Sequence, residues 1–323
     1  MGGLNPDARA ALERIVAAVS LPVRNRARIG ETEIEVGGPG GPTAGLGAAL
    51  YAHFYIVPSP APPPGPGGGG AFLETLRAAN PVPQRFEDGW TVLQADAAGI
   101  LLANPQGGQR RAALAEIVPF AGGIGPGQPV RLAVPRELVT APGGHYVVLG
   151  RPIRDARAGT QTRFYWNVSP AGAAALLGAV GTGLERRRIP FQAKAPVAPE
   201  HYGRADGAVL YLNIEDLEAA LDIVHAATQS VAPSLRAETP LFARRLGPGL
   251  AFAESPPTGD SFGMHRCRLV AEGLVAGFDR GLVEPEARLG AIVERFASYG
   301  LDLAALERNP ATCYPYRLER LAA

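Results

Sequence analysis

The chain has 323 residues, of which 46% are hydrophobic, so it is long enough to bury the core of one large domain or of two modest ones. Lysine and arginine number 31, aspartate and glutamate number 30, and the net charge is +1. This balance excludes a general electrostatic attraction to nucleic acid or to membranes, so any basic function must be local.

Targeting and membrane signals are not evident in the sequence. The first residues, MGGLNPDARAALERIVAAV, place arginine and glutamate among their apolar positions, unlike a signal peptide. No later apolar stretch has the length that a bilayer requires. The two cysteines, Cys267 and Cys313, provide neither a disulfide framework nor metal-ligand spacing. A cytoplasmic protein in a reducing compartment is therefore expected.

The first half of the chain is expected to be an N-terminal scaffold or peptide-binding region, residues 1–150. Asn5, Pro6 and Asp7 are typical of a helix start, and an apolar stripe follows at Leu12, Ile15, Val16 and Val19. Residues 58–70 (PSPAPPPGPGGGG) predict a low-complexity loop without regular structure. Between Trp90 and Gly150, short apolar runs separated by glycine, proline and asparagine predict antiparallel strands and hairpins.

The second half, residues 151–323, is expected to be a C-terminal catalytic α+β region. Strands are predicted at Thr162–Val168, Ile189–Lys194 and Gly207–Asn213, and helices at Pro170–Arg187, Glu215–Thr228, Ser261–Phe278 and Glu284–Ser298. Strands and helices mix without a regular βαβ alternation. The predicted fold class is therefore α+β, with a mixed, largely antiparallel sheet packed with helices.

Lys194 is the only lysine in the chain, so 30 of the 31 basic residues are arginine. A GC-rich genome explains such a bias, and chance can leave a single lysine. However, arginine can replace lysine at most solvated positions but cannot act as a base at neutral pH. Lys194 ends an apolar strand on which it shares a face with Gln192, and partial burial beside arginines would favour the neutral amine that a base requires.

Polar and aromatic residues gather around this lysine in several stretches. Period-two alternation places Arg163, Tyr165 and Asn167 on one face of a strand, with core residues on the other. One face could then line a cleft, although an ordinary strand with one exposed face is an equal alternative. His201 and Arg204 lie in a proline-bounded loop, where functional groups are common but an exposed histidine is equally ordinary.

A helix is predicted to begin at Ser261, and the backbone N–H groups of its first turn would form an anion site. His265 and Arg268 lie three residues apart on one face of this helix, and Arg266 projects differently. A salt-bridged surface would explain the arginines, but not the glycine, histidine and helix cap together. Phosphate binding is therefore the favoured interpretation, whereas a cysteine nucleophile is disfavoured because His265 and Cys267 face different ways.

These stretches resemble the Hop effector A family, named for a plant-pathogen type III secretion effector and found in bacterial peptide natural-product clusters. The resemblance is dense from about Thr162 to Arg268, in five segments: Arg163–Asn167 (RFYWN), Pro190–Lys194 (PFQAK), His201–Asp206 (HYGRAD), Pro248–Glu254 (PGLAFAE) and Ser261–Arg266 (SFGMHR). In lanthipeptide and thioamitide pathways, such proteins are understood as lyases. A partner kinase phosphorylates serine or threonine in a precursor peptide, and the lyase eliminates phosphate to leave dehydroalanine or dehydrobutyrine.

The resemblance implies a role for each candidate residue, by analogy with phosphothreonine lyases that use a lysine base, a histidine acid and arginines on the phosphate. The catalytic candidates are Lys194, His265, His201 and Tyr165. The phosphate-binding candidates are Arg163, Arg204, Arg266, Arg268 and Ser261. The substrate-orienting candidates are Asn167, Gln192, Tyr202 and Asp206. No cofactor is needed for this elimination, and no metal is expected because the histidines and cysteines are scattered.

The expected partners are a phosphorylated precursor peptide, consisting of leader and core, and a kinase. A different class of function stays open: a non-catalytic effector-like or scaffold protein that binds a peptide, a kinase or a chaperone. Peptide affinity without turnover would favour that alternative.

Overall fold

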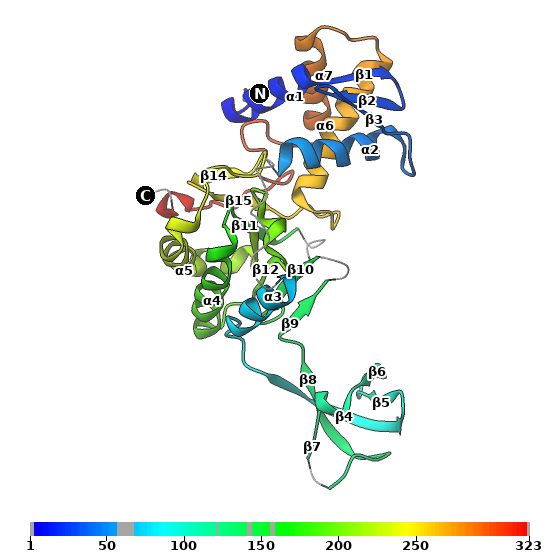
Figure 1. Cartoon of the computed structure of the whole chain (residues 1–323), viewed down its shortest axis with the longest axis vertical. Helices are drawn as coiled ribbons and strands as arrows, with labels where there is room; N and C mark the ends of the chain where they lie inside the picture. The colour runs from blue at the N-terminus through cyan, green and yellow to red at the C-terminus, as the bar shows by residue number, and fades with distance from the viewer. Residues whose placement is uncertain (1–2, 57–67, 121, 141–143, 156–158, 322–323) are drawn as a thin grey trace. The chain divides into compact units, whose positions relative to one another are not determined.

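The computed structural model describes residues 3–56, 68–120, 122–140, 144–155 and 159–321 (Figure 1). The chain divides into two compact units: Met1–Asn80 together with Val139–Ala323, and Pro81–Leu138. We refer to them as the major unit and the inserted unit. The expected division at residue 150 differs from this one, because the helices of the first 80 residues pack against helices near the C-terminus.

A seven-stranded sheet forms the centre of the major unit, in the order β14-β15-β11-β13-β12-β10-β9, and the pairings from β14 to β10 are antiparallel. Its strands are β9 (Glu137–Val139), β10 (His145–Leu149), β11 (Gln161–Trp166), β12 (Gln192–Pro196), β13 (Ala208–Asn213), β14 (Arg244–Gly247) and β15 (Leu250–Glu254). Side chains alternate between the two faces of such a sheet, so each strand contributes to both.

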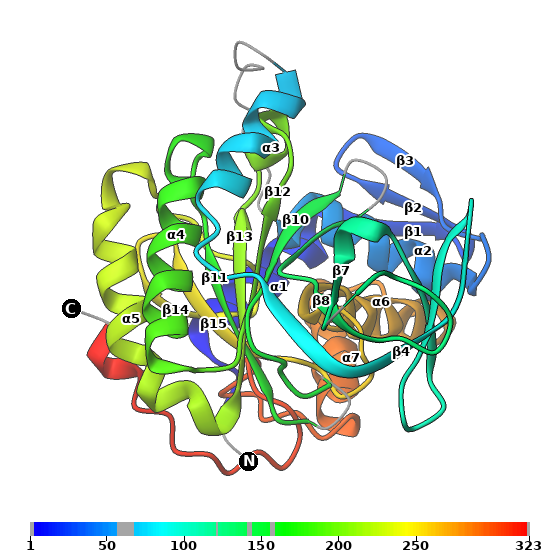
Figure 2. The ribbon, with the colours of Figure 1, turned by 90° about the horizontal axis from the view of Figure 1, so that it is seen from below.

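Two long helices, α4 (Pro170–Arg187) and α5 (Leu217–Ser230), cover one face of the sheet (Figure 2). Trp166 reaches α5, where its indole N–H donates to Thr228 Oγ1 at 2.9 Å. The helices approach closely because α4 carries a glycine, Gly183, at the contact: a Cβ there would lie 2.5 Å from the side chain of Ile223. This face is therefore fully occupied by core packing.

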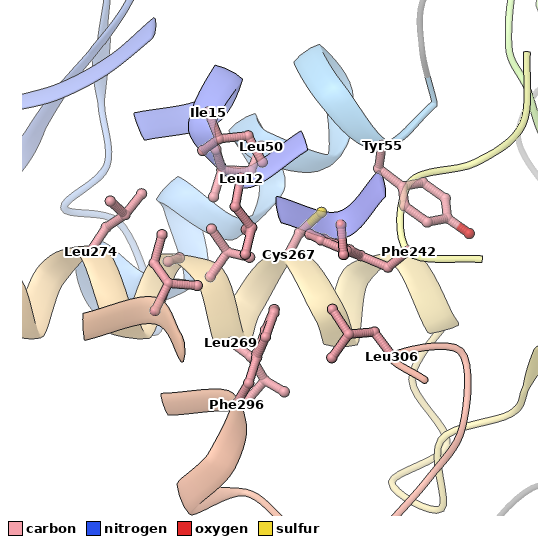
Figure 3. Packing of buried hydrophobic residues seen from close by; sticks show 14 of the residues in the cluster. Leu12, Ile15, Leu50, Tyr55, Phe242, Cys267, Leu269, Leu274, Phe296 and Leu306 are labelled. Atoms are coloured by element: carbon pink, nitrogen blue, oxygen red, sulfur yellow. The ribbon is translucent and has the colours of Figure 1, made fainter. Parts of the chain in front are cut away.

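The other face meets a helical layer whose core includes residues from distant parts of the chain (Figure 3). The layer contains α1 (Pro6–Ala18), α2 (Gly41–Leu50), a π-helical turn η1 (Tyr51–Tyr55), α6 (Phe262–Asp279) and α7 (Pro285–Ser298). Leu269 and Leu274 of α6 belong to one buried cluster with Leu12 of α1 and Phe296 of α7. Burial of such side chains stabilises the layer by about 1.5–3 kcal/mol each.

The remaining elements of the major unit are shorter. A three-stranded sheet consists of β1 (Val19–Val23), β2 (Arg26–Ile29) and β3 (Thr32–Glu35), and α3 is Gly68–Ala78. Short 3₁₀ turns are η4 (Pro199–Tyr202), η5 (Ile214–Asp216), η6 (Ala232–Ser234) and η7 (Leu318–Leu321). Residues 58–67 of the expected glycine- and proline-rich loop lie outside the described residues. Residues 68–70, also expected in that loop, instead form the first turn of α3.

The inserted unit is a five-stranded antiparallel sheet in the order β6-β5-β4-β8-β7. Its elements are β4 (Arg85–Asp96), β5 (Gly99–Ala103), β6 (Gln109–Ala112), η2 (Leu114–Glu116), β7 (Ile117–Pro119) and β8 (Pro129–Val134). Its own core contains Trp90, Val92, Leu102 and Leu132. The hairpins expected after Trp90 are therefore present, and the α+β class with largely antiparallel sheets is confirmed.

Local signals in the sequence correspond to observed caps. Asn5 Oδ1 accepts from the backbone N–H groups of Asp7 and Ala8 at the start of α1. The helix predicted from Glu215 begins instead as the turn η5, and α5 follows from Leu217. Cys267 is buried, Cys313 is exposed, and both are free. Within the described ranges, no helix is long and apolar enough to cross a membrane, and no group of three potential ligands could hold a metal ion.

Candidate functional site

Three neighbouring strands place the predicted polar residues on the sheet face opposite α4 and α5. Arg163 of β11 lies opposite Tyr211 of β13, and Tyr211 lies opposite Gln192 of β12. Two residues along, Tyr165 and Lys194 both lie opposite Val209 on that same face. The expected alternation in β11 is correct, but both of its faces are buried, so the Arg163 face is not an open cleft wall along its length.

The ring of Tyr211 lies near two cationic side chains. Its centroid is 5.7 Å from Lys194 Nζ and 5.2 Å from the Arg163 guanidinium carbon. Lys194 is half-buried and has no ion-pair or hydrogen-bond partner in the described part of the chain. The lone lysine is thus held beside an aromatic ring with its amine available for a ligand.

His145 is the residue of this face that the sequence analysis missed. It begins β10, opposite Pro196 of β12, and Lys194 is the next β12 residue on the same face. Burial lowers the pKa of His145 to about 4, and the positive charges of Lys194 and Arg204 add to the effect. The imidazole is therefore neutral at pH 7. The sequence signal that could have identified it is a histidine at the start of the apolar run HYVVL. The sequence analysis assigned that run to the scaffold region.

Arg204 and Asp206 form a half-buried ion pair at the edge of this face. Arg204 Nε donates to one carboxylate oxygen of Asp206, and Nη2 donates to the other at 2.9 Å. The same Nη2 lies 2.8 Å from the hydroxyl of Tyr51, a residue of η1. Burial would lower the pKa of Arg204, but Asp206 raises it overall, so the guanidinium stays charged and fixed in place. His201, exposed on η4, lies close enough to contribute to the pKa of His145.

Tyr165 has a buried hydroxyl that interacts with the side chains of Tyr55 and Arg163. Burial raises its pKa to about 12, against the opposing effect of Arg163. The neighbouring Tyr55 packs against the start of α6, where a Cβ on Gly263 would lie 2.4 Å from its ring. Gly263 is therefore needed for close packing with Tyr55.

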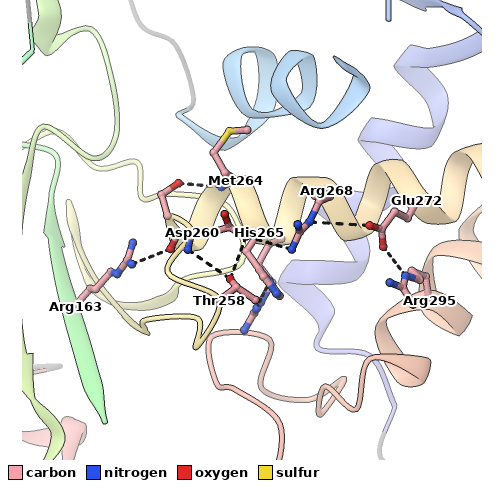
Figure 4. A network of polar contacts seen from close by, with 10 residues as sticks. Arg163, Thr258, Asp260, Met264, His265, Arg268, Glu272 and Arg295 are labelled. Atoms are coloured by element: carbon pink, nitrogen blue, oxygen red, sulfur yellow. Dashed lines mark hydrogen bonds and ion pairs between the residues drawn. The ribbon is translucent and has the colours of Figure 1, made fainter. Parts of the chain in front are cut away.

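The start of α6 is occupied by groups of the protein itself (Figure 4). Ser261 Oγ accepts from the backbone N–H of Met264 at 3.2 Å, as the predicted helix cap requires. Arg163 Nη2 donates to the backbone carbonyl of Asp260 at 3.1 Å, and the Asp260 carboxylate pairs with Arg268 at 3.2 Å. An anion at this helix start would meet the adjacent Asp260 carboxylate, which opposes its binding.

His265 and Arg266 contact the end of α7 and the segment that follows it. Arg266 Nε donates to the carbonyl of Leu306 at 2.8 Å, and Nη2 donates to that of Arg308 at 2.6 Å. Its Nη1 lies 2.7 Å from Nδ1 of His265, whose ring packs edge-on against Tyr299. Arg266 is fully buried, and its donors bind the protein rather than lining a phosphate site.

Two substrate-orienting candidates also have structural contacts. Tyr202 is buried and donates to the Pro196 carbonyl at 3.1 Å. Asn167 lies beyond the end of β11, and its amide donates to the Glu238 carbonyl at 3.1 Å. The structure thus brings together Lys194, Gln192, Tyr165, Arg163, Arg204, Asp206 and His201. The contacts of Asn167, Tyr202, His265, Arg266, Arg268 and Ser261 lie elsewhere.

The comparisons with known proteins concern the part of the chain that carries this face. The model of the HopA1 effector protein family matches residues 138–308, just over half of the chain. The chain belongs to the HopA1 effector protein family. The matched range begins before His145 and ends after α7, so it includes β10–β13 and every candidate residue above. The resemblance inferred from five short segments is confirmed and extends further toward the N-terminus than those segments.

A solved structure shows the same fold. An effector protein from Pseudomonas syringae pv. tomato strain DC3000 has a TM-score of 0.52 and 17% identity, covering 94% of this chain and 96% of that one. An effector from Pseudomonas syringae pv. syringae strain 61 has a TM-score of 0.46 and 20% identity, covering 83% of this chain and 96% of that one. No curated protein matches the sequence. These comparisons therefore establish the family and the fold, but they do not establish an activity.

The buried imidazole of His265 predicts a pH-dependent stability. Burial, followed by the charge of Arg266, lowers the pKa of His265 from 6.5 to about 3. Below pH 6.5, His265 is protonated in the unfolded chain but stays neutral in the folded chain. The contribution of His265 to the free energy of unfolding therefore falls as pH falls below 6.5 and is constant well above that pH. Between pH 6.5 and 5 we expect a loss on the order of 1 kcal/mol from this residue.

Urea unfolding at several pH values would measure this loss. In His265→Asn the amide oxygen can still accept from Arg266, and the pH dependence should be shallower. The exposed His53→Asn is the matched control and should keep the wild-type slope. Equal slopes in all three proteins would contradict the assignment of a depressed pKa to His265.

Proposed function

We propose that this HopA1 protein is a lyase that eliminates phosphate from phosphoserine or phosphothreonine in a ribosomal precursor peptide, leaving dehydroalanine or dehydrobutyrine. The observation that carries the proposal is the unpaired amine of Lys194, close to His145, Arg204 and the Arg163–Tyr211 pair. An elimination of this kind needs a base, a phosphate site and a donor to the peptide carbonyl, and this face offers all three.

Lys194 acts as the base in the proposed reaction. Its neutral amine takes the proton from Cα of the phosphorylated residue. The electron pair of that C–H bond forms the Cα=Cβ double bond, and the Cβ–O bond breaks with its electrons leaving on phosphate. Lys194 ends the step as an ammonium and returns its proton to solvent. Tyr165, neutral because its pKa is raised to about 12, donates its hydroxyl proton in a hydrogen bond to the developing enolate oxygen.

Arg204 and Arg163 are proposed to hold the departing phosphate. Each guanidinium is anchored through its Nε and Nη2 atoms. Nη1 of Arg204 has no partner in the described ranges, whereas Arg163 also interacts with the hydroxyl of Tyr165. Arginine suits phosphate oxygens because its donors are planar and permanently charged. Asp206 and Tyr51 orient the guanidinium of Arg204. Gln192 lies beside Tyr211, where we assign it a role in orienting the substrate.

His145 is proposed as the acid, in place of His265 or the exposed His201. Without substrate, burial and the charges of Lys194 and Arg204 keep it neutral. A phosphate dianion bound beside Arg204 offsets the effect of that guanidinium and raises the pKa of the imidazole, so a proton becomes available to the leaving oxygen. His265 lacks this role because its ring contacts Arg266 and Tyr299.

The test is to incubate the protein with a synthetic phosphothreonine peptide and follow loss of phosphoric acid by mass spectrometry. The unphosphorylated peptide and a His53→Asn variant are controls for substrate and protein. Turnover that requires the phosphate and disappears in His145→Asn would support the proposal. Peptide binding without turnover, unchanged by substitution of Lys194, would favour a scaffold that presents a peptide to its kinase.

A further inference from the structure

A cavity of about 700 Å³ in the major unit lies apart from the Lys194 face. It lies between the N-terminal half of α1, the turn that leads into β14, and the segment 304–308. Its walls include Arg14 of α1, Arg244 and Arg245 of β14, and Arg308. The volume is within the range typical of ligand sites, and no step of the proposed elimination uses it.

Three arginines of this cavity have no carboxylate within ion-pair distance among the described residues. Arg14, Arg244 and Arg245 have no hydrogen-bond or ion-pair partner within the described ranges, whereas Arg9, one turn earlier on α1, pairs with Glu13 at 2.8 Å. Arg308 donates to the Tyr314 carbonyl, but its Nε is buried without a partner.

Two acidic side chains, Asp7 and Glu307, share the walls with these four arginines. Burial raises the pKa of Glu307, and the nearby charges of Arg244 and Arg308 oppose that rise. Four arginines thus face two carboxylates in the described walls. The cavity therefore has an excess of positive charge.

The backbone beside the cavity offers a second means of recognition. β14 is the last strand of the seven-stranded sheet and pairs only with β15, so no strand of the described structure lies along its other edge. Two residues before β14, Phe242 has φ of 65°, a conformation that costs a non-glycine residue about 1 kcal/mol or more. An edge strand with adjacent charges is a common site for adding an extended peptide.

We propose that this cavity binds an acidic, extended segment of a peptide, whose backbone pairs with the edge of β14 and whose carboxylates meet Arg14, Arg244 and Arg245. The unpaired arginines come from two separate elements, α1 and β14, so they suit several carboxylates along a chain better than one phosphate group. This inference goes beyond the proposed elimination and does not depend on Lys194.

The experiment measures binding of a fluorescein-labelled, alternating Glu-Ala octapeptide by anisotropy at low salt. An otherwise identical Gln-Ala peptide is the probe control. The variant is the triple substitution Arg14→Gln, Arg244→Gln and Arg245→Gln, and the protein control is Arg28→Gln, an exposed arginine of β2 without a partner. We expect the triple variant to bind the acidic peptide roughly tenfold more weakly, and Arg28→Gln to bind it normally.

Three results would overturn the inference: equal binding of the two peptides, an unchanged affinity in a folded triple variant, or displacement of the peptide by inorganic phosphate at equal molar concentration. Thermal unfolding shows whether the triple variant is folded, and single substitutions replace it if it is not.

Lys194→Ala should bind the acidic peptide normally. A short phosphothreonine peptide without acidic residues should react equally with wild type and the triple variant, so failure here is distinguishable from failure of the elimination.

Discussion

Replacing Lys194 with arginine is expected to lower the rate of phosphate elimination by about 10²–10⁴-fold without unfolding the protein. Arginine keeps the positive charge and the contact with the Tyr211 ring, but it cannot lose its proton at neutral pH. If Lys194 only attracted the phosphopeptide through its positive charge, the arginine would replace it and the elimination rate would be nearly unchanged. The measurement is single-turnover elimination on a phosphothreonine peptide at saturating protein concentration, which separates the chemical step from binding.

The matched control is Arg28→Lys, which exchanges the same two residue types on an exposed strand of the small sheet. It should retain wild-type turnover. A Lys194→Arg protein that retains more than about a third of wild-type activity would rule out Lys194 as the base and leave it an electrostatic role.

Replacing Arg266 with lysine is expected to lower the free energy of unfolding by about 2–4 kcal/mol. The arginine bridges the carbonyl groups of Leu306 and Arg308 and also contacts His265, and a lysine ammonium cannot reach all three. Burial lowers the pKa of Arg266 to about 10, so the side chain is charged at pH 7 and its lost hydrogen bonds are charge-assisted. Urea denaturation would report the change.

Arg268→Lys, two residues along the same helix, provides the comparison. Arg268 is 40% exposed and pairs with Asp260 at 3.2 Å, so its conservative replacement should change stability by less than about 1 kcal/mol. If Arg266→Lys were as stable as wild type and instead weakened phosphopeptide binding, the arginine would be a phosphate ligand, as the sequence pattern indicated.

The sequence predicted the side-chain directions in the strands of the site better than it predicted the contacts of the residues in α6. Period-two alternation depends on covalent geometry, so Arg163 and Tyr165 could be assigned to one face without knowledge of the fold. Lys194 was recognised by composition, and the sheet register then placed it on the same face. Both inferences use short segments whose side-chain direction is fixed locally.

The tertiary partners of the arginines were not predictable in this way. Arg266 and Arg204 both lie in short segments that carry the family resemblance, SFGMHR and HYGRAD. Yet one binds carbonyl groups 40 and more residues away and the other binds a carboxylate two residues away. His145 was missed for the same reason, since its proximity to Lys194 arises from the pairing of β10 with β12 across about 50 residues of chain. Local patterns identify candidate donors, but long-range pairing decides which of them meet.

The antiparallel register of β10, β12, β13 and β11 has a consequence for how this family can diverge. A single-residue insertion or deletion within β12 would move Ala193 or Ala195 onto the face of Lys194 and turn the lysine toward α4. Length changes in the connecting loops leave the register unaltered. Homologues that retain the chemistry should therefore vary in the lengths of their loops and insertions, while the spacing between Gln192 and Lys194 stays at two residues.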